Sequence, residues 1–254
     1  MARIDLHVHS IFSDGKNTPE EMVREAIARG MDAIGFSDHS YTFFDESYCI
    51  PKAELARYRA CVEELKNRYR GKIRVLCGIE QDFYSQEPCE GYDYVIGSVH
   101  YIRAGEEYIP VDESPEILRA AAEKHFGGDL YALIEEYYRT AARVVQKTGA
   151  HIIGHFDLIA KFNEGGALFD ETDPRYVAAS REAADCLLKT GRPFEINTGA
   201  VSRSFRTVPY PSGALRDYIR GRGGRFVLAS DSHEKDGLCF LFEAFQKEAE
   251  DWTF

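Results

Sequence analysis

Short apolar runs alternate along the chain with longer amphipathic segments, and few folds accommodate that order. The runs lie at residues 4–8, 32–36, 72–79, 92–99, 150–153, 193–196 and 225–229. Strands that alternate with helices predict a parallel sheet covered by helices. The runs are apolar throughout, as expected of parallel strands that are buried on both faces. We therefore expect a single barrel of β/α units, with a doubly wound open sheet as the alternative.

The segments between these runs carry the end signals of helices. The first helix should follow Thr18, because Pro19 and Glu21 complete the pattern of a capping box, and Gly30 should end it. Further helices are predicted at residues 52–70, 114–126, 130–148, 174–190, 212–220 and 238–250. No composition break, linker or repeat divides the 254 residues, so we expect one domain.

Composition narrows the function classes. The net charge of −11 argues against a protein that coats nucleic acid, but bound cations could still let the chain act on a phosphate ester. No stretch approaches the ~20 apolar residues of a membrane helix, and the first residues lack the layout of a signal peptide. The 6 cysteines form no C-x-x-C pair. We therefore expect a cytoplasmic protein with reduced thiols and no membrane partner.

Residues with metal-binding side chains gather at the C-terminal ends of the predicted strands, where β/α barrels build their active sites. Six of the 8 histidines lie there: His7, His9, His39, His100, His155 and His233. The other two, His125 and His151, are expected to be structural. His151 precedes His155 by four residues, which is about 13 Å along a strand, so the two cannot share an ion.

Two spacings give this cluster a geometry. His7 and His9 are two residues apart on a strand, so their side chains leave the same face and can share a cation. Asp231 and His233 have the same spacing. Imidazole and carboxylate ligands suit zinc, iron or manganese. Glu80 is the candidate for a carboxylate that bridges two ions.

Several short motifs occur in one order between His7 and His233: HVHS, SDG, SDHS, GIE, IGSVH, GHFD and SDSH. Together they resemble the polymerase and histidinol phosphatase (PHP) superfamily. Within it, the phrases DYVIGSVHYI, GHFDLIAKFN and EINTGAVSRSFRTVPYPS look like those of histidinol-phosphate phosphatases. The resemblance implies a distorted barrel of seven β/α units and a single PHP metallophosphoesterase domain over residues 1–254. It also implies hydrolysis of L-histidinol phosphate in histidine biosynthesis.

Carried over residue by residue, the resemblance implies a site for two to three divalent ions of zinc, manganese or iron. The first ion would be held by His7, His9, Glu80 and Asp231. The second would share Glu80 and be completed by His100 and His155. The third would be held by Asp14, His39 and His233, although an Asp before Gly in a loop also serves as a turn former. Catalytic roles are implied for Glu80, Asp231 and His233, and Asp38 would orient a ligand.

Such ions suit phosphate ester hydrolysis by a metal-bridging hydroxide, because they lower the pKa of a bound water and hold the phosphate oxygens. An arginine fork matches phosphate oxygens. The resemblance implies an arginine in the loop after residues 193–196 as a phosphate contact, and Arg203 fits it best. Arg206 and Lys161 are further candidates, with solvated surface charges as the alternative. The candidate contacts for the substrate amine and imidazole are Glu195, Asp112 and Asp157.

Two other functions stay open. The chain could be a PHP phosphoesterase for nucleotides, oligonucleotide ends or phosphotyrosine, although it shows no basic, aromatic-rich groove for nucleic acid. It could also be a metal-binding domain that has lost catalysis, against which the intact ligand set argues. The expected partner is thus a small phosphomonoester and not a nucleic acid.

Overall fold

Seven parallel strands form a nearly closed barrel in the computed structural model, which describes residues 2–251. They adjoin one another in chain order: β1 (Ile4–Asp5), β2 (Ala33–Phe36), β3 (Arg74–Asp82), β4 (Tyr94–Ser98), β7 (Ile152–Ile153), β8 (Phe194–Asn197) and β9 (Phe226–Ala229). Beyond β1 and β9, Val8 pairs in parallel with Ser232, and the His9 amide donates to the Ser232 carbonyl at 2.9 Å. The two edges of the sheet therefore meet, and the predicted barrel is confirmed.

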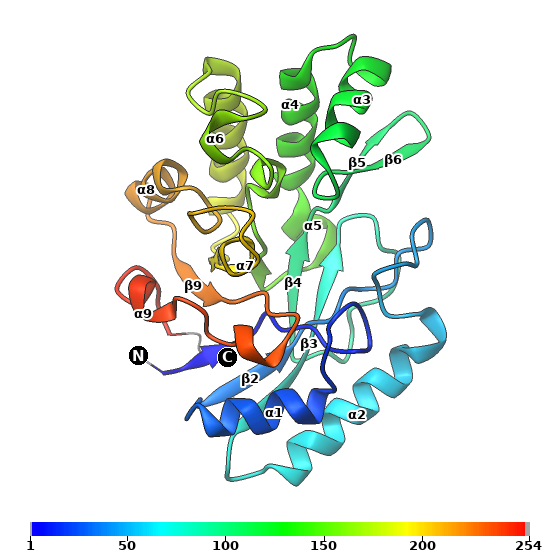
Figure 1. The fold of residues 1–254 in the computed structure, drawn as a ribbon, viewed down its shortest axis with the longest axis vertical. Coiled ribbons are helices and arrows are strands. Elements are labelled where there is room, and N and C mark those ends of the chain that lie inside the picture. The colour runs from blue at the N-terminus through cyan, green and yellow to red at the C-terminus, as the bar shows by residue number, and fades with distance from the viewer. Residues whose placement is uncertain (1, 252–254) are drawn as a thin grey trace.

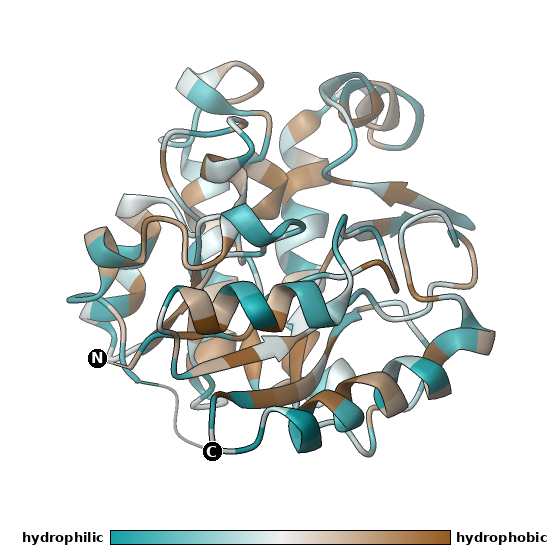
Figure 2. Ribbon diagram, turned by 60° about the horizontal axis from the view of Figure 1, so that its bottom comes forward, coloured by the Kyte–Doolittle hydropathy of each residue, from teal (hydrophilic) through white to brown (hydrophobic). Residues whose placement is uncertain are grey.

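Helices surround the barrel (Figure 1). They are α1 (Pro19–Ala28), α2 (Leu55–Arg68), α3 (Pro115–His125), α4 (Leu130–Ala141), α5 (Val144–Thr148), α6 (Pro174–Leu188), α7 (Gly199–Ser202), α8 (Gly213–Gly221) and α9 (Phe242–Phe245). The helices carry polar and apolar residues while the strands are mostly apolar, as Figure 2 shows. The predicted capping box begins α1: Thr18 Oγ1 accepts from the Glu21 amide, and Glu21 Oε2 accepts from the Thr18 amide at 2.8 Å. No helix within residues 2–251 is long and apolar enough to cross a bilayer.

The structure corrects parts of the sequence-based assignment. The helix predicted at residues 130–148 is interrupted between α4 and α5, and the one at 52–70 begins with a 3-10 turn, Lys52–Glu54. The closing helix at 238–250 is reduced to α9, because Cys239 and Leu241 adopt left-handed φ angles of 54° and 56°. An antiparallel hairpin, β5 (Tyr101–Ala104) and β6 (Glu107–Pro110), was not predicted.

Tyr94 fills the barrel interior below the C-terminal strand ends. Its side chain is fully buried, and its hydroxyl oxygen lies 2.6 Å from the Leu6 carbonyl oxygen and 3.1 Å from that of Phe36. A Cβ atom at Gly35 or Gly78 would overlap the Tyr94 ring, so both positions require glycine. The ring thus ties β4 to the ends of β1 and β2, which continue into the histidine-bearing segments.

Replacing Tyr94 with phenylalanine should lower the free energy of unfolding by about 1–2 kcal/mol, because the buried carbonyls of Leu6 and Phe36 lose the single O–H donor that they share. Urea denaturation of the metal-free protein measures the change. Tyr218→Phe is the matched control, since its hydroxyl donates to Asp185 outside the barrel, and it should change stability by less than about 0.5 kcal/mol. Equal losses in the two variants would contradict a special role for Tyr94.

Candidate active site

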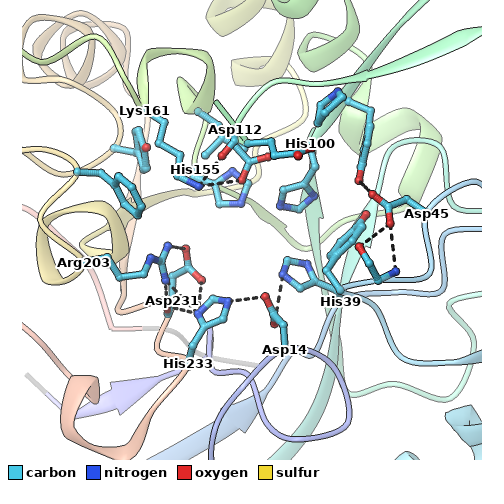
Figure 3. Close-up of a pocket in the computed structure, with 18 residues that line it drawn as sticks. Asp14, His39, Asp45, His100, Asp112, His155, Lys161, Arg203, Asp231 and His233 are labelled. Atoms are coloured by element: carbon cyan, nitrogen blue, oxygen red, sulfur yellow. Dashed lines mark hydrogen bonds and ion pairs between the residues drawn. The ribbon is translucent and has the colours of Figure 1, made fainter. Parts of the chain in front are cut away.

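A cavity of about 500 Å³ lies at the C-terminal ends of the barrel strands. The parallel topology brings the polar residues that follow successive strands to this one face. Of the predicted metal ligands, those that line the cavity are Asp14, His39, His100, His155, Asp231 and His233. Their side chains converge on it from different segments (Figure 3). His7, His9 and Glu80 are more deeply buried in the same cluster.

Glu80, on β3, lies at the centre of the cluster and is only 1% exposed. Its carboxylate is surrounded by five imidazoles. Oε2 lies 3.2, 3.6 and 2.9 Å from ring nitrogens of His7, His9 and His39, and Oε1 lies 2.8 and 3.4 Å from those of His155 and His100. Each carboxylate oxygen thus faces a different set of histidines, which is the arrangement expected of a bridging ligand.

Two further carboxylates complete the cluster. Asp231 Oδ1 lies 3.2 Å from His9 Nε2 and 3.7 Å from His7 Nε2. Asp14, which comes from the loop after β1, places Oδ2 3.2 Å from His233 Nε2 and Oδ1 3.7 Å from His39 Nε2. Each of the three predicted ligand groups therefore converges in space. His9 lies between the first and the third, because its Nδ1 is also 3.7 Å from Asp14 Oδ1.

The donor set fits divalent metal ions. Both ring nitrogens of His9, His7 Nε2 and Glu80 Oε2 are buried without a hydrogen-bond partner among the described residues, whereas buried polar atoms normally have one. The imidazole and carboxylate atoms form three sets, and the atoms of each set lie within 4.8 Å of one another; one set is His7, His9 and Glu80. Nitrogen and oxygen ligands of this kind bind zinc, manganese or iron.

Burial and neighbouring charges set the protonation of His9 and Glu80. Burial, together with His233 and His39, lowers the pKa of His9 to about 3, so its imidazole is neutral at pH 7. Burial favours the protonated form of Glu80, but the surrounding imidazoles of His7, His39 and His100 hold its pKa well below the usual range. A neutral imidazole and an ionised carboxylate are the forms that bind metal.

Two basic side chains reach the cavity beside the cluster. Arg203 follows α7, and its Nη2 donates to Asp231 Oδ2 at 3.1 Å while Nη1 donates to the Asp231 carbonyl at 2.8 Å. Lys161 Nζ donates to the backbone oxygen and to Oδ2 of Asp112, at 2.7 and 3.1 Å. Both residues line the cavity.

Arg206 has a different environment. Its side chain is 3% exposed, lies 3.8 Å from Asp157 Oδ2, and is not among the residues that line the cavity. The surface-charge alternative is therefore wrong for Arg206, and also for Lys161, whose side chain is 14% exposed. Asp157, one of the three candidate contacts for the substrate amine and imidazole, is fully buried outside the cavity lining and accepts from the Ser212 amide, so it is not placed to contact a substrate.

The arrangement agrees with comparisons to known proteins. Residues 5–199 match the PHP domain family. This chain belongs to the PHP domain family. A Deinococcus radiodurans protein named "Probable histidinol-phosphatase" is 30% identical over 97% of this chain and 92% of its own length.

Two solved structures share the fold of this chain. The hisK protein of Listeria monocytogenes superposes with a TM-score of 0.79 at 17% identity, over 95% of this chain and 99% of its own. Histidinol phosphate phosphatase from Lactococcus lactis subsp. lactis, solved with zinc, L-histidinol and phosphate, gives 0.67 at 22% identity, over 98% and 94%. The predicted PHP-type fold is thus confirmed.

In this PHP domain, Glu195 orients a histidine of the cluster and is not a substrate contact as the sequence suggested. It is 1% exposed, its Oε1 lies 2.7 Å from His7 Nδ1, and its Oε2 accepts from the His155 amide at 3.1 Å. Asn197, two residues along β8, also donates to Oε2. Carboxylates that hold the far nitrogen of a ligand histidine fix its tautomer and direction.

The sequence did not predict a role for Asp82, and it predicted for Asp38 a role in orienting a ligand that the structure does not show. Asp82 Oδ2 lies 3.3 Å from His100 Nδ1 and accepts from the His100 amide. Asp82 follows Glu80 by two residues on one strand, so the two side chains share a face, and that spacing could have revealed it. Asp38 accepts from Ser10 and Ser13 and thereby holds the loop that carries Asp14, instead of orienting His39.

Replacing Glu195 with glutamine should weaken metal binding by the PHP domain about 10- to 100-fold, because His7 loses its carboxylate partner. Competition with a chromogenic chelator measures the metal affinity. Glu182→Gln, at an exposed position of α6, is the control and should bind metal like the parent protein. Unchanged affinity in the Glu195 variant would show that Glu195 does not position His7.

Proposed function

We propose that this PHP domain protein is a metal-dependent phosphomonoesterase that hydrolyses L-histidinol phosphate to L-histidinol and phosphate. The observation that carries the proposal is the buried cluster around Glu80, which opens into a cavity beside Arg203. The histidinol-phosphatase name of the Deinococcus relative supports it, as do the L-histidinol and phosphate bound in the Lactococcus structure.

The three groups of ligands predicted from the sequence are the proposed metal positions. His7, His9, Glu80 and Asp231 would hold one ion, His100 and His155 would share Glu80 for a second, and Asp14, His39 and His233 would hold a third. Bound divalent ions polarise phosphate oxygens and make a coordinated water acidic enough to act as a nucleophile. The role of Glu80, Asp231 and His233 is to hold these ions at the reacting centre.

The protein's own cations complete phosphate binding. The Arg203 guanidinium has five N–H donors, and its contacts with Asp231 and His233 leave some of them available to a phosphate. Lys161 would add a second positive charge at the cavity. Because Asp112 already holds Lys161, that charge is positioned before substrate arrives. The small cavity fits a small phosphomonoester, and we place the reaction in histidine biosynthesis in the cytoplasm, carried out by a single domain.

The decisive experiment compares substrates on one preparation. Protein loaded with Zn²⁺, Mn²⁺ or Fe²⁺ should hydrolyse L-histidinol phosphate with a kcat/KM at least about a hundredfold above that for AMP or phosphotyrosine, as expected for a difference of a few contacts. Chelator-treated protein should lose this activity and regain it when metal returns. Comparable kcat/KM values for all three substrates would overturn the assignment.

A further inference from the structure

Two basic side chains and an acidic side chain lie on different sides of the cavity. Arg203 and Lys161 lie on one side, and Asp45, from the segment after β2, lies across the opening near His39 (Figure 3). A phosphomonoester bound with its phosphate at Arg203 and its alcohol portion directed across the opening would meet Asp45. The side chains around Asp45 decide which alcohols can be accommodated there.

Asp45 is held by neutral donors alone. The Tyr101 hydroxyl donates to Oδ2 at 2.6 Å, and the Ser47 amide and hydroxyl donate to Oδ1 at 3.0 and 2.6 Å. Within residues 2–251, no Lys, Arg or His nitrogen lies within 4.0 Å of the Asp45 carboxylate; Asp112 and Asp231 instead pair with Lys161 and Arg203. The negative charge of Asp45 is therefore fixed in position and uncompensated. A carboxylate has about four acceptor sites, so one remains for a ligand.

Two tyrosines line the cavity together with Asp45, and one of them, Tyr101, donates to its carboxylate. The rings of Tyr48 and Tyr101 have centroids 6.1 Å apart, and the Tyr48 ring lies 4.9 Å from the ring of His39. The Tyr48 hydroxyl is 3.1 Å from Thr42 Oγ1, which fixes the ring beside the metal cluster. The faces of tyrosine rings attract cations, and flat rings pack well against them.

We propose that Asp45, Tyr48 and Tyr101 form a subsite for the cationic end of the substrate alcohol, an ammonium or a protonated imidazole. The inference rests on the proposed function and deepens it, because it assigns the residues that select a positively charged phosphomonoester. Glu195 and Asp157 cannot serve this purpose because both are buried outside the cavity lining, and Asp112 is already paired with Lys161.

The test is the Asp45→Asn variant, which keeps the shape of the side chain and removes its charge. The readout is the ratio of kcat/KM for L-histidinol phosphate to that for p-nitrophenyl phosphate, an ester without a cation. We expect this ratio to fall at least about tenfold, as for loss of a charge-assisted contact. L-Histidinol should also inhibit the hydrolysis of p-nitrophenyl phosphate by the variant at least about tenfold more weakly than it inhibits the same reaction of the parent enzyme.

Glu46→Gln is the matched control, since Glu46 adjoins Asp45 in the chain and is exposed but does not line the cavity. Its ratio should equal that of the parent. If Asp45→Asn leaves the ratio unchanged while the parent enzyme cleaves L-histidinol phosphate, the subsite is overturned and the proposed function stands. A parent enzyme that does not cleave L-histidinol phosphate would overturn the proposed function. If L-histidinol still inhibits its hydrolysis of p-nitrophenyl phosphate, and Asp45→Asn weakens this inhibition, the subsite stands. Absence of both cleavage and inhibition overturns both.

Discussion

A Glu80→Gln variant should hydrolyse L-histidinol phosphate at least about a thousandfold more slowly than the parent and should retain less metal, since the metal ions supply the chemistry. Glu80 faces five imidazoles with its two oxygens, and an amide offers only one oxygen and no charge. The side chain keeps its size, so the barrel should remain folded. Kinetics and elemental analysis of the same preparation measure both effects.

The control for this variant is Glu90→Gln, which removes a carboxylate of the same type at an exposed position. It should retain parent-level activity and metal content. His9→Ala, which removes a ligand from the group that contains Glu80, should also lose turnover and metal. A Glu80 variant with normal metal content and normal kcat would remove Glu80 from the centre of the site.

The parallel sheet and the cluster could be predicted from the sequence because both depend on local patterns. The choice of a barrel over an open sheet needed the resemblance to the PHP superfamily. Seven apolar runs separated by helices determine a parallel sheet, and parallel strands bring their C-terminal ends to one face. A histidine or carboxylate that directly follows one strand therefore lies close to those that follow the other strands, however far apart they are in the sequence. Asp14 lies in a loop, and only the resemblance to the PHP superfamily placed it among the ligands.

The roles of the residues around the predicted ligands could not be predicted, because their contacts depend on packing, which short sequence patterns do not encode. Glu195 looks like any polar residue at a strand end, and only the fold shows that its carboxylate turns toward His7 and away from the cavity. Arg206 lies three residues after Arg203, yet the turn after α7 directs it to Asp157. The β5–β6 hairpin was missed in the same way, although it contributes Tyr101 to the cavity wall.

Replacing Arg203 with alanine should lower kcat/KM for L-histidinol phosphate about 10- to 100-fold, which corresponds to the loss of a charge-assisted contact of about 1.5–3 kcal/mol. Arg203 is the basic residue nearest the cluster, and its guanidinium contacts both Asp231 and His233. Its fork matches the oxygens of a phosphate, so Arg203→Lys should recover only part of the loss. Initial rates over a range of substrate concentrations separate KM from kcat.

Arg206→Ala is the control that distinguishes a loss of phosphate binding in Arg203→Ala from general damage to the segment after α7. Removing Arg206 leaves the buried Asp157 carboxylate without its cation, so this variant should lose thermal stability. Arg203 is one-third exposed, and its loss should change the melting temperature far less than the loss of Arg206. If the Arg203 variant were as unstable as the Arg206 variant, its activity loss would report on folding. Unchanged kcat/KM in a stable Arg203→Ala protein would assign the phosphate contact to Lys161, the other basic side chain that faces the cavity within the described residues.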